Sequence, residues 1–293
     1  MIHLTRTRGC LAAIVALMLA GLAGCSWPDE EQVKPAVAVK QPDAVAPSKP
    51  VEAQPVSRKR LQKSFKEAVI LDPPAGQQCM PVRTFAGKNV AGIFEAVAGA
   101  KFEGGLWDRV DFFDAQGRPI RYRAVVKTDL GEMHIDLLSD AAPHHVTNFI
   151  ALARAGYYDG LVFERTIRVP TADEQTELIE AGCPLGTGEP GHGSIGYWLK
   201  PEFNNEAHIE GTVGACHAEE PDTAACKFYI TLNKAPILDQ HFTVFAKVTN
   251  GLDVARKIFT LPVRNDAAYP EGDRPEKPVV IRKVTIVTKD TEK

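Results

Sequence analysis

Short segments typical of β-strands recur through positions 122–288, and they limit the possible folds more than any other feature of the chain. Residues 122–128 and 132–138 alternate on either side of the turn 129–131, which predicts a β-hairpin. Further short strands are expected at 162–165, 193–198, 211–215, 228–232, 243–248 and 279–288. Closing such strands into a barrel leaves no strand edge exposed. The pattern therefore predicts a mainly β protein built on an eight-stranded closed antiparallel β-barrel.

Two helices are expected among these strands. Pro143 begins the first, because a proline in the first turn gives up no helical hydrogen bond. Gly156 is typical of a residue that ends a helix. The apolar residues between them recur at spacings of three and four, which places them on one buried face: Val146, Phe149, Ile150 and Ala153. A second helix is expected at about 252–259.

The N-terminus has the pattern of an export signal. Arg6 and Arg8 precede an apolar stretch at 11–22, whose 12 residues are too few to span a bilayer. The stretch ends in Leu-Ala-Gly-Cys at 22–25, which resembles a bacterial lipobox. We expect residues 1–24 to be a lipoprotein signal peptide and Cys25 to be lipidated. An ordinary secretory signal with a coincidental cysteine is the alternative. Ser26, in place of an aspartate, favours the outer membrane of a bacterial envelope, facing the periplasm.

Two segments separate this signal from the barrel region. Residues 25–60 are rich in proline and alanine without apolar periodicity, which predicts a disordered tether. Residues 61–117 are too short for an independent core, so we expect an N-terminal extension packed on the main domain at 118–289. Within this extension the pattern predicts a helix at 89–98 and a strand at 106–113.

Four short blocks follow one another in fixed order within the barrel region. They read Phe-Glu-Arg at 163–165, Gly-Thr-Val-Gly at 211–214, Phe-Tyr-Ile-Thr at 228–231 and Leu-Asp-Gln-His-Phe-Thr-Val-Phe at 238–245. In this order and at these spacings the region 122–288 resembles the cyclophilin-type peptidyl-prolyl isomerases. The resemblance implies an eight-stranded barrel with a helix capping each end, and an enzyme that rotates X-Pro bonds without a cofactor or metal.

Rotation of an X-Pro bond demands little machinery. The barrier is about 18–20 kcal/mol because the amide C–N bond has double-bond character, and uncatalysed exchange takes tens to hundreds of seconds. A catalyst needs a pocket for the proline ring and a fixed donor near the prolyl nitrogen. A guanidinium suits this role because it is permanently charged and directional. The resemblance places Arg165 at the position of the family's catalytic arginine.

The resemblance also implies a set of substrate-binding residues. Tyr229 and Leu238 match pocket positions, while Ile237 replaces a common tryptophan and Phe242 a histidine or tyrosine. The strand that binds the substrate backbone corresponds to Cys216, His217 and Ala218. The imidazole of His217 either replaces a side-chain contact with substrate or is simply solvated.

The chain departs from the family pattern around the arginine. Lys227 and Glu180 stand where the family usually has glutamines, and Glu180 is placed to pair with Arg165 or with Lys227. Residues 166–178 are about seven residues longer than expected and align Leu178 with the pocket floor. This insertion either covers the site as a flap or bulges into solvent.

The mature chain keeps four cysteines, at 79, 183, 216 and 226. In an oxidising compartment a Cys216–Cys226 disulfide would clamp a loop, whereas buried free thiols are the alternative. A zinc site including His217 matches no usual ligand spacing. The glycine-rich stretch 182–193 lacks the features of a phosphate loop.

Two functions remain. The first is a peptidyl-prolyl isomerase that assists the folding of envelope proteins, and the second is a catalytically weak chaperone or assembly module that binds proline peptides. Expected partners are proline-containing segments of unfolded or exported proteins, and the membrane through lipidated Cys25. The net charge of −3 and the pI near 6.3 do not favour nucleic acid. We expect a monomer with no cofactor and no metal.

Overall fold

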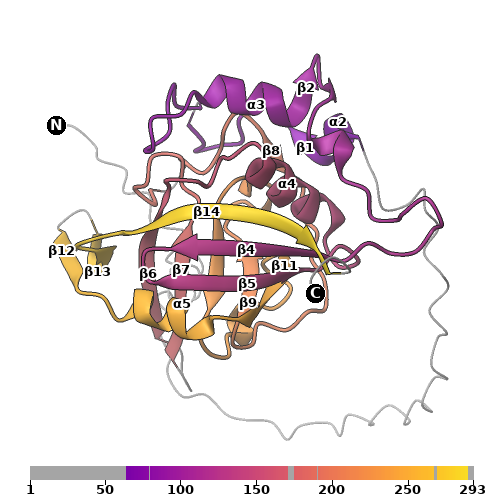
Figure 1. Ribbon diagram of the computed structural model, residues 1–293. Coiled ribbons are helices and arrows are strands. Elements are labelled where there is room, and N and C mark those ends of the chain that lie inside the picture. The colour runs from indigo at the N-terminus through magenta and orange to yellow at the C-terminus, as the bar shows by residue number, and fades with distance from the viewer. Residues whose placement is uncertain (1–63, 79, 171–174, 190, 267–268, 290–293) are drawn as a thin grey trace, which may run out of the picture.

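The computed structural model describes residues 64–78, 80–170, 175–189, 191–266 and 269–289. Within these residues eight antiparallel strands close into a barrel in the order β10-β7-β6-β14-β4-β5-β11-β9 (Figure 1). The predicted closed barrel is therefore confirmed. The expected signal peptide and the expected tether lie outside the described residues.

The barrel strands agree with the sequence pattern at seven of eight places. The bounds are β4 (Tyr122–Thr128), β5 (Gly131–Leu137), β6 (Val162–Pro170), β7 (Gln175–Ala181), β9 (Thr212–Ala215), β10 (Phe228–Thr231), β11 (Val244–Asn250) and β14 (Val279–Thr288). Except at its last residue, Trp198, which belongs to the short strand β8 (Trp198–Leu199), the strand expected at 193–198 is wrong. There the hydroxyl of Ser194 accepts from the backbone N–H groups of Gly196 and Tyr197, which makes a local turn. The eighth barrel strand is β7, which the sequence pattern missed.

A helix lies at each end of the barrel, as expected. In Figure 1, α4 (Pro143–Arg154) lies above the strands and α5 (Leu252–Phe259) below them. The end of α4 forms two backbone hydrogen bonds beyond its last turn, from Gly156 to Ala153 and from Tyr157 to Leu152. These require a left-handed residue, and Gly156 has φ of 69°. Gly156 therefore ends α4 as predicted.

Residues 64–78 and 80–121 pack over the α4 end of the barrel. Helix α3 (Val90–Ala98) begins after Asn89, whose side chain accepts from the N–H of Gly92, and it runs above α4 in Figure 1. The short helix α2 (Phe65–Ala68) and strand β1 (Val69–Ile70) precede it, and β1 pairs with β8 (Trp198–Leu199). Phe65 makes edge-to-face contacts with Trp107 at 5.4 Å and with Tyr197 at 5.0 Å. These aromatic contacts make the extension continuous with the barrel's hydrophobic core.

The strand expected at 106–113 is wrong. Trp107–Arg109 form a 3-10 helix, η2, after the short hairpin β2 (Gly99–Ala100) and β3 (Glu103–Gly104). The carboxylate of Asp108 accepts from the N–H of Gly104, and this bond holds the turn that buries Trp107. The burial of Trp107, rather than the alternation of apolar and polar residues, therefore decides the local structure at 106–113.

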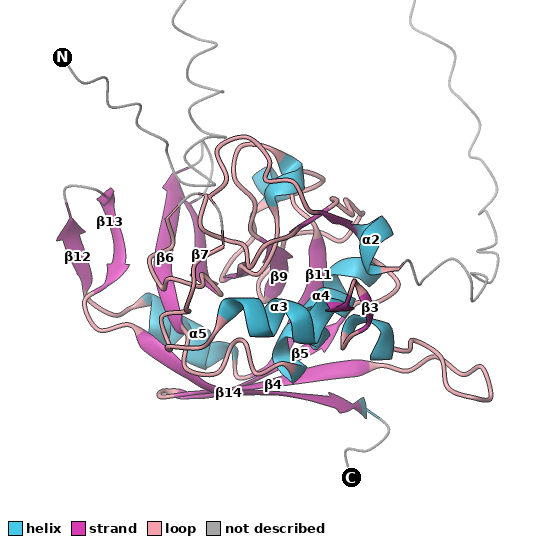
Figure 2. Ribbon diagram, turned by 90° about the horizontal axis from the view of Figure 1, so that it is seen from above, coloured by secondary structure: helices cyan, strands magenta, loops and turns pink. Residues whose placement is uncertain are grey.

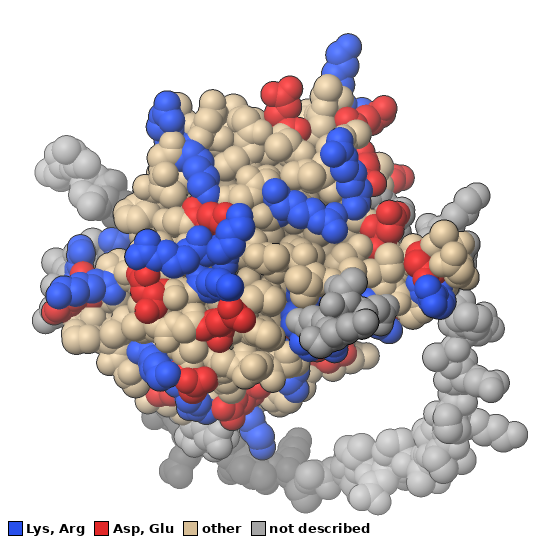
Figure 3. All heavy atoms as spheres, viewed as in Figure 1, with Lys and Arg blue, Asp and Glu red and all other residues tan. Residues whose placement is uncertain are grey.

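A hairpin formed by β12 (Val263–Asp266) and β13 (Tyr269–Pro275) lies beside β6 (Figure 2). Basic and acidic side chains are interspersed on the face shown in Figure 3. No helix in the described parts of the chain combines the length and the apolar character needed to cross a bilayer.

Candidate functional site

A β-bulge in strand β6 decides which way Arg165 points. Phe163 pairs with Ala181, but the next pair joins Arg165 to Glu180, so that Glu164 is the extra residue. Without the bulge, the side-chain alternation would place Arg165 on the opposite face. Glu180 in turn lies opposite Tyr229 on β10. The bulge therefore aligns Arg165, Glu180 and Tyr229 in one row on the outer face of the barrel.

An apolar cluster separate from the main core continues this row. Ile167 lies two residues after Arg165, and Leu178 is fully buried on β7. The cluster also takes residues from three places further along the chain, and it consists of Ile167, Leu178, Cys216, Tyr229, Ala235, Leu238 and Phe242, with Ile237 packed at its edge. Most of the predicted pocket residues are therefore together. Ile167 and Ala235 were not predicted, because single apolar residues in short segments carry no distinguishing signal.

A buried ion network joins Arg165 to the two residues that depart from the family pattern. Glu180 Oε2 lies 3.0 Å from Lys227 Nζ and 3.6 Å from a guanidinium nitrogen of Arg165. The thiol of Cys216 also donates to Glu180. Burial alone would raise the pKa of Glu180, yet the cations of Lys227 and Arg165 hold that pKa below its ordinary value. The carboxylate is therefore ionised and pairs with both cations, so both of the expected pairings occur.

Glu164, the extra residue of the bulge, is a second buried acid beside this network. Its Oε1 accepts from the N–H of Cys183, while its Oε2 has no hydrogen-bond partner among the described residues. Burial is the largest cause that raises its pKa to about 7, and Glu180 adds to this while Lys227 opposes it. Sequence reasoning noted Glu164 only as part of a block, because nothing in the pattern shows that its side chain is buried.

The segment 183–188 covers Arg165. A Cβ atom placed on Gly188 would come within 2.6 Å of Arg165 Cδ, so only glycine permits this approach. Lys227 Nζ donates to Gly188 O at a distance of 3.4 Å. Two more hydrogen bonds hold the segment. The N–H of Phe85 donates to Pro184 O, and the guanidinium of Arg274 donates to Thr187 O. Only 3% of Arg165 is exposed, and Gly188 contributes to this burial.

A hydrogen-bonded chain fixes Tyr229 from behind. His208 Nδ1 lies 2.8 Å from Asp239 Oδ1, and His208 Nε2 lies 2.7 Å from the Tyr229 hydroxyl. Because the carboxylate can only accept, Nδ1 carries the proton and the tyrosine donates to Nε2. A Cβ on Gly214 would come within 2.2 Å of this hydroxyl, which explains the second glycine of the block 211–214. His208 was missed, because a lone histidine outside the blocks has no sequence signal.

The loop after β9 places the remaining predicted residues. Cys216 belongs to the apolar cluster, and the N–H of Ala218 donates to the Thr223 hydroxyl. His217 is 6% exposed, so the alternative of a solvated imidazole is wrong. Its ring stacks on Phe242 with centroids 4.1 Å apart.

The cysteines of the described residues are buried free thiols. They are Cys183, Cys216 and Cys226, so the Cys216–Cys226 disulfide is wrong, and Cys79 lies outside the described residues. Burial raises the pKa of Cys226 to about 12. Among the described residues no group of three His, Cys, Asp or Glu side chains could hold a metal ion.

The insertion after Arg165 lengthens a hairpin. Strands β6 and β7 stay paired from Phe163 as far as the pair Pro170–Gln175, which brings Leu178 into the apolar cluster as expected. The guanidinium of Arg168 lies 4.2 Å from the ring centroid of Phe259, so this part of the hairpin leans on α5. Its tip at 171–174 lies outside the described residues, and the expected alternatives of a flap over the site or a bulge into solvent concern these residues.

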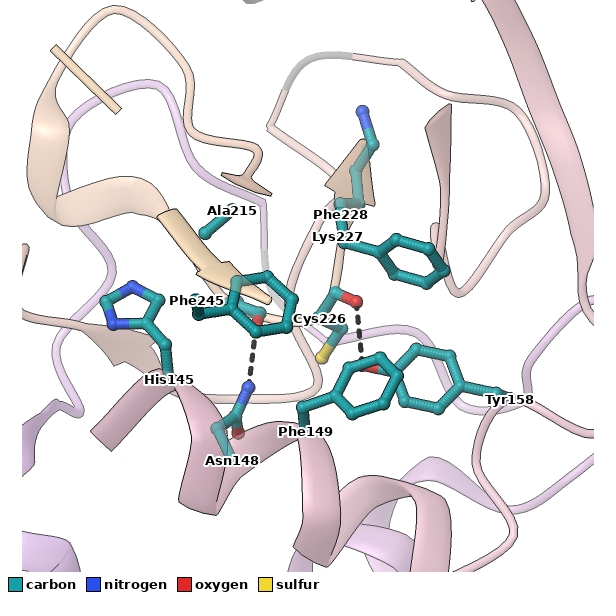
Figure 4. Close-up of a pocket in the computed structure, with 10 residues that line it drawn as sticks. His145, Asn148, Phe149, Tyr158, Ala215, Cys226, Lys227, Phe228 and Phe245 are labelled. Atoms are coloured by element: carbon teal, nitrogen blue, oxygen red, sulfur yellow. Dashed lines mark hydrogen bonds between the residues drawn. The ribbon is translucent and has the colours of Figure 1, made fainter. Parts of the chain in front are cut away.

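A small cavity lies on the other side of β10, between α4 and the barrel (Figure 4). Its lining includes His145, Asn148 and Phe149 from α4, and Figure 4 shows the Lys227 amine directed away from it. The amide of Asn148 donates to Ala225 O across this space. The cavity does not include Arg165 and is distinct from the outer-face site.

Comparisons with known proteins identify one family of relatives. Residues 123–286 match the family described as cyclophilin type peptidyl-prolyl cis-trans isomerase/CLD. The chain is 35% identical over 161 residues to Peptidyl-prolyl cis-trans isomerase-like 3 of Gallus gallus, which covers 54% of this chain and 92% of that protein. It is 34% identical over 159 residues to Peptidyl-prolyl cis-trans isomerase ppi1 of Schizosaccharomyces pombe, covering 54% and 94%.

Among solved structures, a cyclophilin type peptidyl-prolyl cis-trans isomerase of Cryptosporidium parvum aligns with a TM-score of 0.49 and 22% identity, over 57% of this chain and 98% of that one. The family match covers more than half of the chain and includes every strand of the barrel in whole or in part. This chain therefore belongs to the cyclophilin-type peptidyl-prolyl cis-trans isomerase family.

Proposed function

We propose that the chain catalyses rotation of X-Pro bonds at the outer-face site, with Arg165 acting on the prolyl nitrogen. One observation carries this proposal: the bulge in β6 places Arg165 on the outer face of the barrel, next to the apolar cluster that contains Tyr229, Leu238 and Phe242. A guanidinium next to an apolar pocket supplies a fixed donor and a grip on the proline ring. Its benefit arises mainly in the twisted transition state, where the nitrogen lone pair leaves conjugation.

Glu180 orients the arginine in this proposal. Its carboxylate lies against the guanidinium on one side and Lys227 on the other. Lys227 balances the second charge, so that Glu180 does not neutralise Arg165 by itself. The pair Glu180–Lys227 then does what two neutral glutamines do in the usual family pattern.

Substrate access requires movement of the segment 183–188, because only 3% of Arg165 is exposed beneath it. This burial also favours the second candidate, a module that grips proline peptides in the apolar cluster and turns them over slowly. The two candidates differ in what Arg165 contributes. In an isomerase, loss of Arg165 lowers the rate of cis-to-trans exchange. In a binding module, loss of Arg165 leaves peptide affinity, the property that matters there, almost unchanged.

The test is cis-to-trans exchange of a proline-containing tetrapeptide, measured on the purified chain by magnetisation-exchange NMR. Arg165→Ala should lower kcat/KM by about 100-fold or more, since loss of one transition-state donor has effects of that order. Arg165→Lys is the matched control, because it keeps the charge and loses the planar fork. Peptide binding by Arg165→Ala should stay close to that of the parent. An alanine variant that isomerises as fast as the parent would refute the assignment.

We further propose that the substrates are segments of exported proteins, and that Cys25 anchors the chain to a bacterial envelope membrane. The lipobox-like segment 22–25 and the following proline-rich residues support this proposal. Mass spectrometry of the N-terminal peptide should find an acylated Cys25 at the start of the mature chain. Cys25→Ser should move the protein from the membrane fraction to the soluble fraction. An unmodified cysteine in the mature protein would contradict the anchor.

A further inference from the structure

His217 lies over the aromatic wall of the candidate proline pocket. Its ring and that of Phe242 are nearly parallel, at 19°, with centroids 4.1 Å apart. On another side, Phe242 meets Tyr229 edge to face, at 5.8 Å and 87°. Only 1% of Phe242 is exposed. A planar five-membered ring thus already occupies a face of the pocket where a proline ring would pack.

The contacts of the imidazole show how firmly it is held there. Nδ1 lies 2.8 Å from Ala218 O, and Nε2 lies 2.8 Å from His241 O. Both partners are acceptors, so both contacts are hydrogen bonds only when the ring carries two protons. Burial lowers the pKa of His217, and the neighbouring basic residues His145 and His241 lower it further, while the two carbonyls oppose this. The neutral ring donates from one nitrogen only, and the other nitrogen then faces a carbonyl oxygen without a proton.

A neutral ring in this position is displaceable. Leaving the pocket costs one hydrogen bond and one stacking contact, and it relieves the approach of a lone pair to a carbonyl oxygen. The loop that carries the ring has a separate fastening, because the N–H of Ala218 donates to the Thr223 hydroxyl at 2.7 Å. The side chain can therefore rotate away while the loop stays in place.

We propose that His217 is a gate on the proline pocket: its imidazole covers Phe242 in the free protein and swings out when a prolyl ring enters. This proposal rests on the proposed isomerase function, and it makes His217 a residue that sets the affinity of the pocket for prolyl peptides. The gate raises KM for every prolyl peptide. It does so by the same factor for each peptide, because the cost of displacing the ring does not depend on the flanking residues.

Kinetics of His217→Ala on the purified chain test the gate. The variant should raise kcat/KM for a proline tetrapeptide by about tenfold, mainly through a lower KM, since one hydrogen bond and one stacking contact no longer compete with substrate. His217→Phe keeps an aromatic ring over Phe242 and should not show this gain. His134→Ala, on β5 away from the site, is the control for removal of a histidine. A folded His217→Ala variant with an unchanged or raised KM would overturn the gate.

An NMR measurement on the parent protein covers the case in which His217→Ala does not fold. Stacking on Phe242 should shift the ring protons of His217 upfield in the free protein, and saturating tetrapeptide should abolish that shift. A ring that keeps its upfield shift in the complex would overturn the gate. Failure of the proposed function looks different, because the parent would then bind peptide and displace His217 without accelerating exchange.

Discussion

The two faces of strands β7 and β10 are both buried, yet they carry opposite chemistry. On the inner face, Ile179, Phe228 and Ile230 pack into the barrel core with other apolar side chains. On the outer face, Glu180 lies between two cations, and Tyr229 ends a chain of hydrogen bonds. The inner face is buried by closure of the barrel itself. The outer face is buried only because loops lie across it.

This difference shows why the outer face can work as a site. Side chains inside the barrel cannot be uncovered without unfolding, whereas the loops at 183–188 and 216–218 rest on a few hydrogen bonds and ring contacts. The ionic groups Arg165, Glu180 and Lys227 on the outer face can be hydrated when a loop moves, so brief exposure to water costs them little. The same two strands can therefore have a rigid inner face and an outer face whose covering loops move.

The largest expected effect tests the inner face. Phe228→Ala should lower the free energy of unfolding by about 3–5 kcal/mol, because a large ring is lost from a packed core. Phe228 makes edge-to-face contacts with Phe149 and Tyr158, so the cavity cannot collapse easily. Urea unfolding followed by circular dichroism measures the change. A loss below about 1 kcal/mol would mean that the inner face repacks as readily as the outer one.

On the outer face, Glu180→Gln should lower the free energy of unfolding by an amount at the lower end of the roughly 3–5 kcal/mol expected for breaking a buried ion pair. It leaves Arg165 and Lys227 facing each other without a carboxylate. The double variant Glu180→Gln with Lys227→Gln should recover most of the loss, since one of the two cations is removed as well. Equal losses in the single and double variants would show that the network is not coupled.

Glu164 should make stability fall as pH rises. Its pKa is raised from 4.5 to about 7 in the folded protein, so the folded state holds a proton that the unfolded state releases between those two values. The free energy of unfolding therefore decreases across this window. Glu164→Gln should remove that decrease and be more stable than the parent at pH 8 by about 1–3 kcal/mol. Parallel pH profiles of parent and variant would contradict the buried neutral acid.

The smallest expected effect comes from Tyr229→Phe. The variant keeps the ring in the apolar cluster and loses only the hydroxyl that donates to His208 Nε2. Unfolding should become easier by about 1 kcal/mol, the usual net value of one such hydrogen bond. The same urea series measures it. A stability equal to that of the parent would show that the chain Asp239–His208–Tyr229 positions the ring without stabilising the fold.

The barrel and much of the site were predictable because their signals are local or ordered along the chain. The hairpin at 122–138, helix α4 with its stop at Gly156, and helix α5 all follow from alternation or helical spacing. The ordered blocks brought Tyr229, Leu238 and Phe242 into one predicted pocket, and the structure has them in one cluster. The strands at 193–198 and 106–113 failed because a serine-centred turn and the burial of Trp107 outweighed alternation.

By itself the sequence determined the strand pattern, the capping helices and the residue types that an X-Pro site requires, since these depend on spacing along the chain. The tertiary structure alone decided the direction of Arg165, the burial of Glu164 and Glu180, the partner of Tyr229 and the place of His217. Each of these depends on a contact between segments far apart in sequence. A one-residue bulge or a loop laid across a sheet changes which groups meet, and no local pattern records either event.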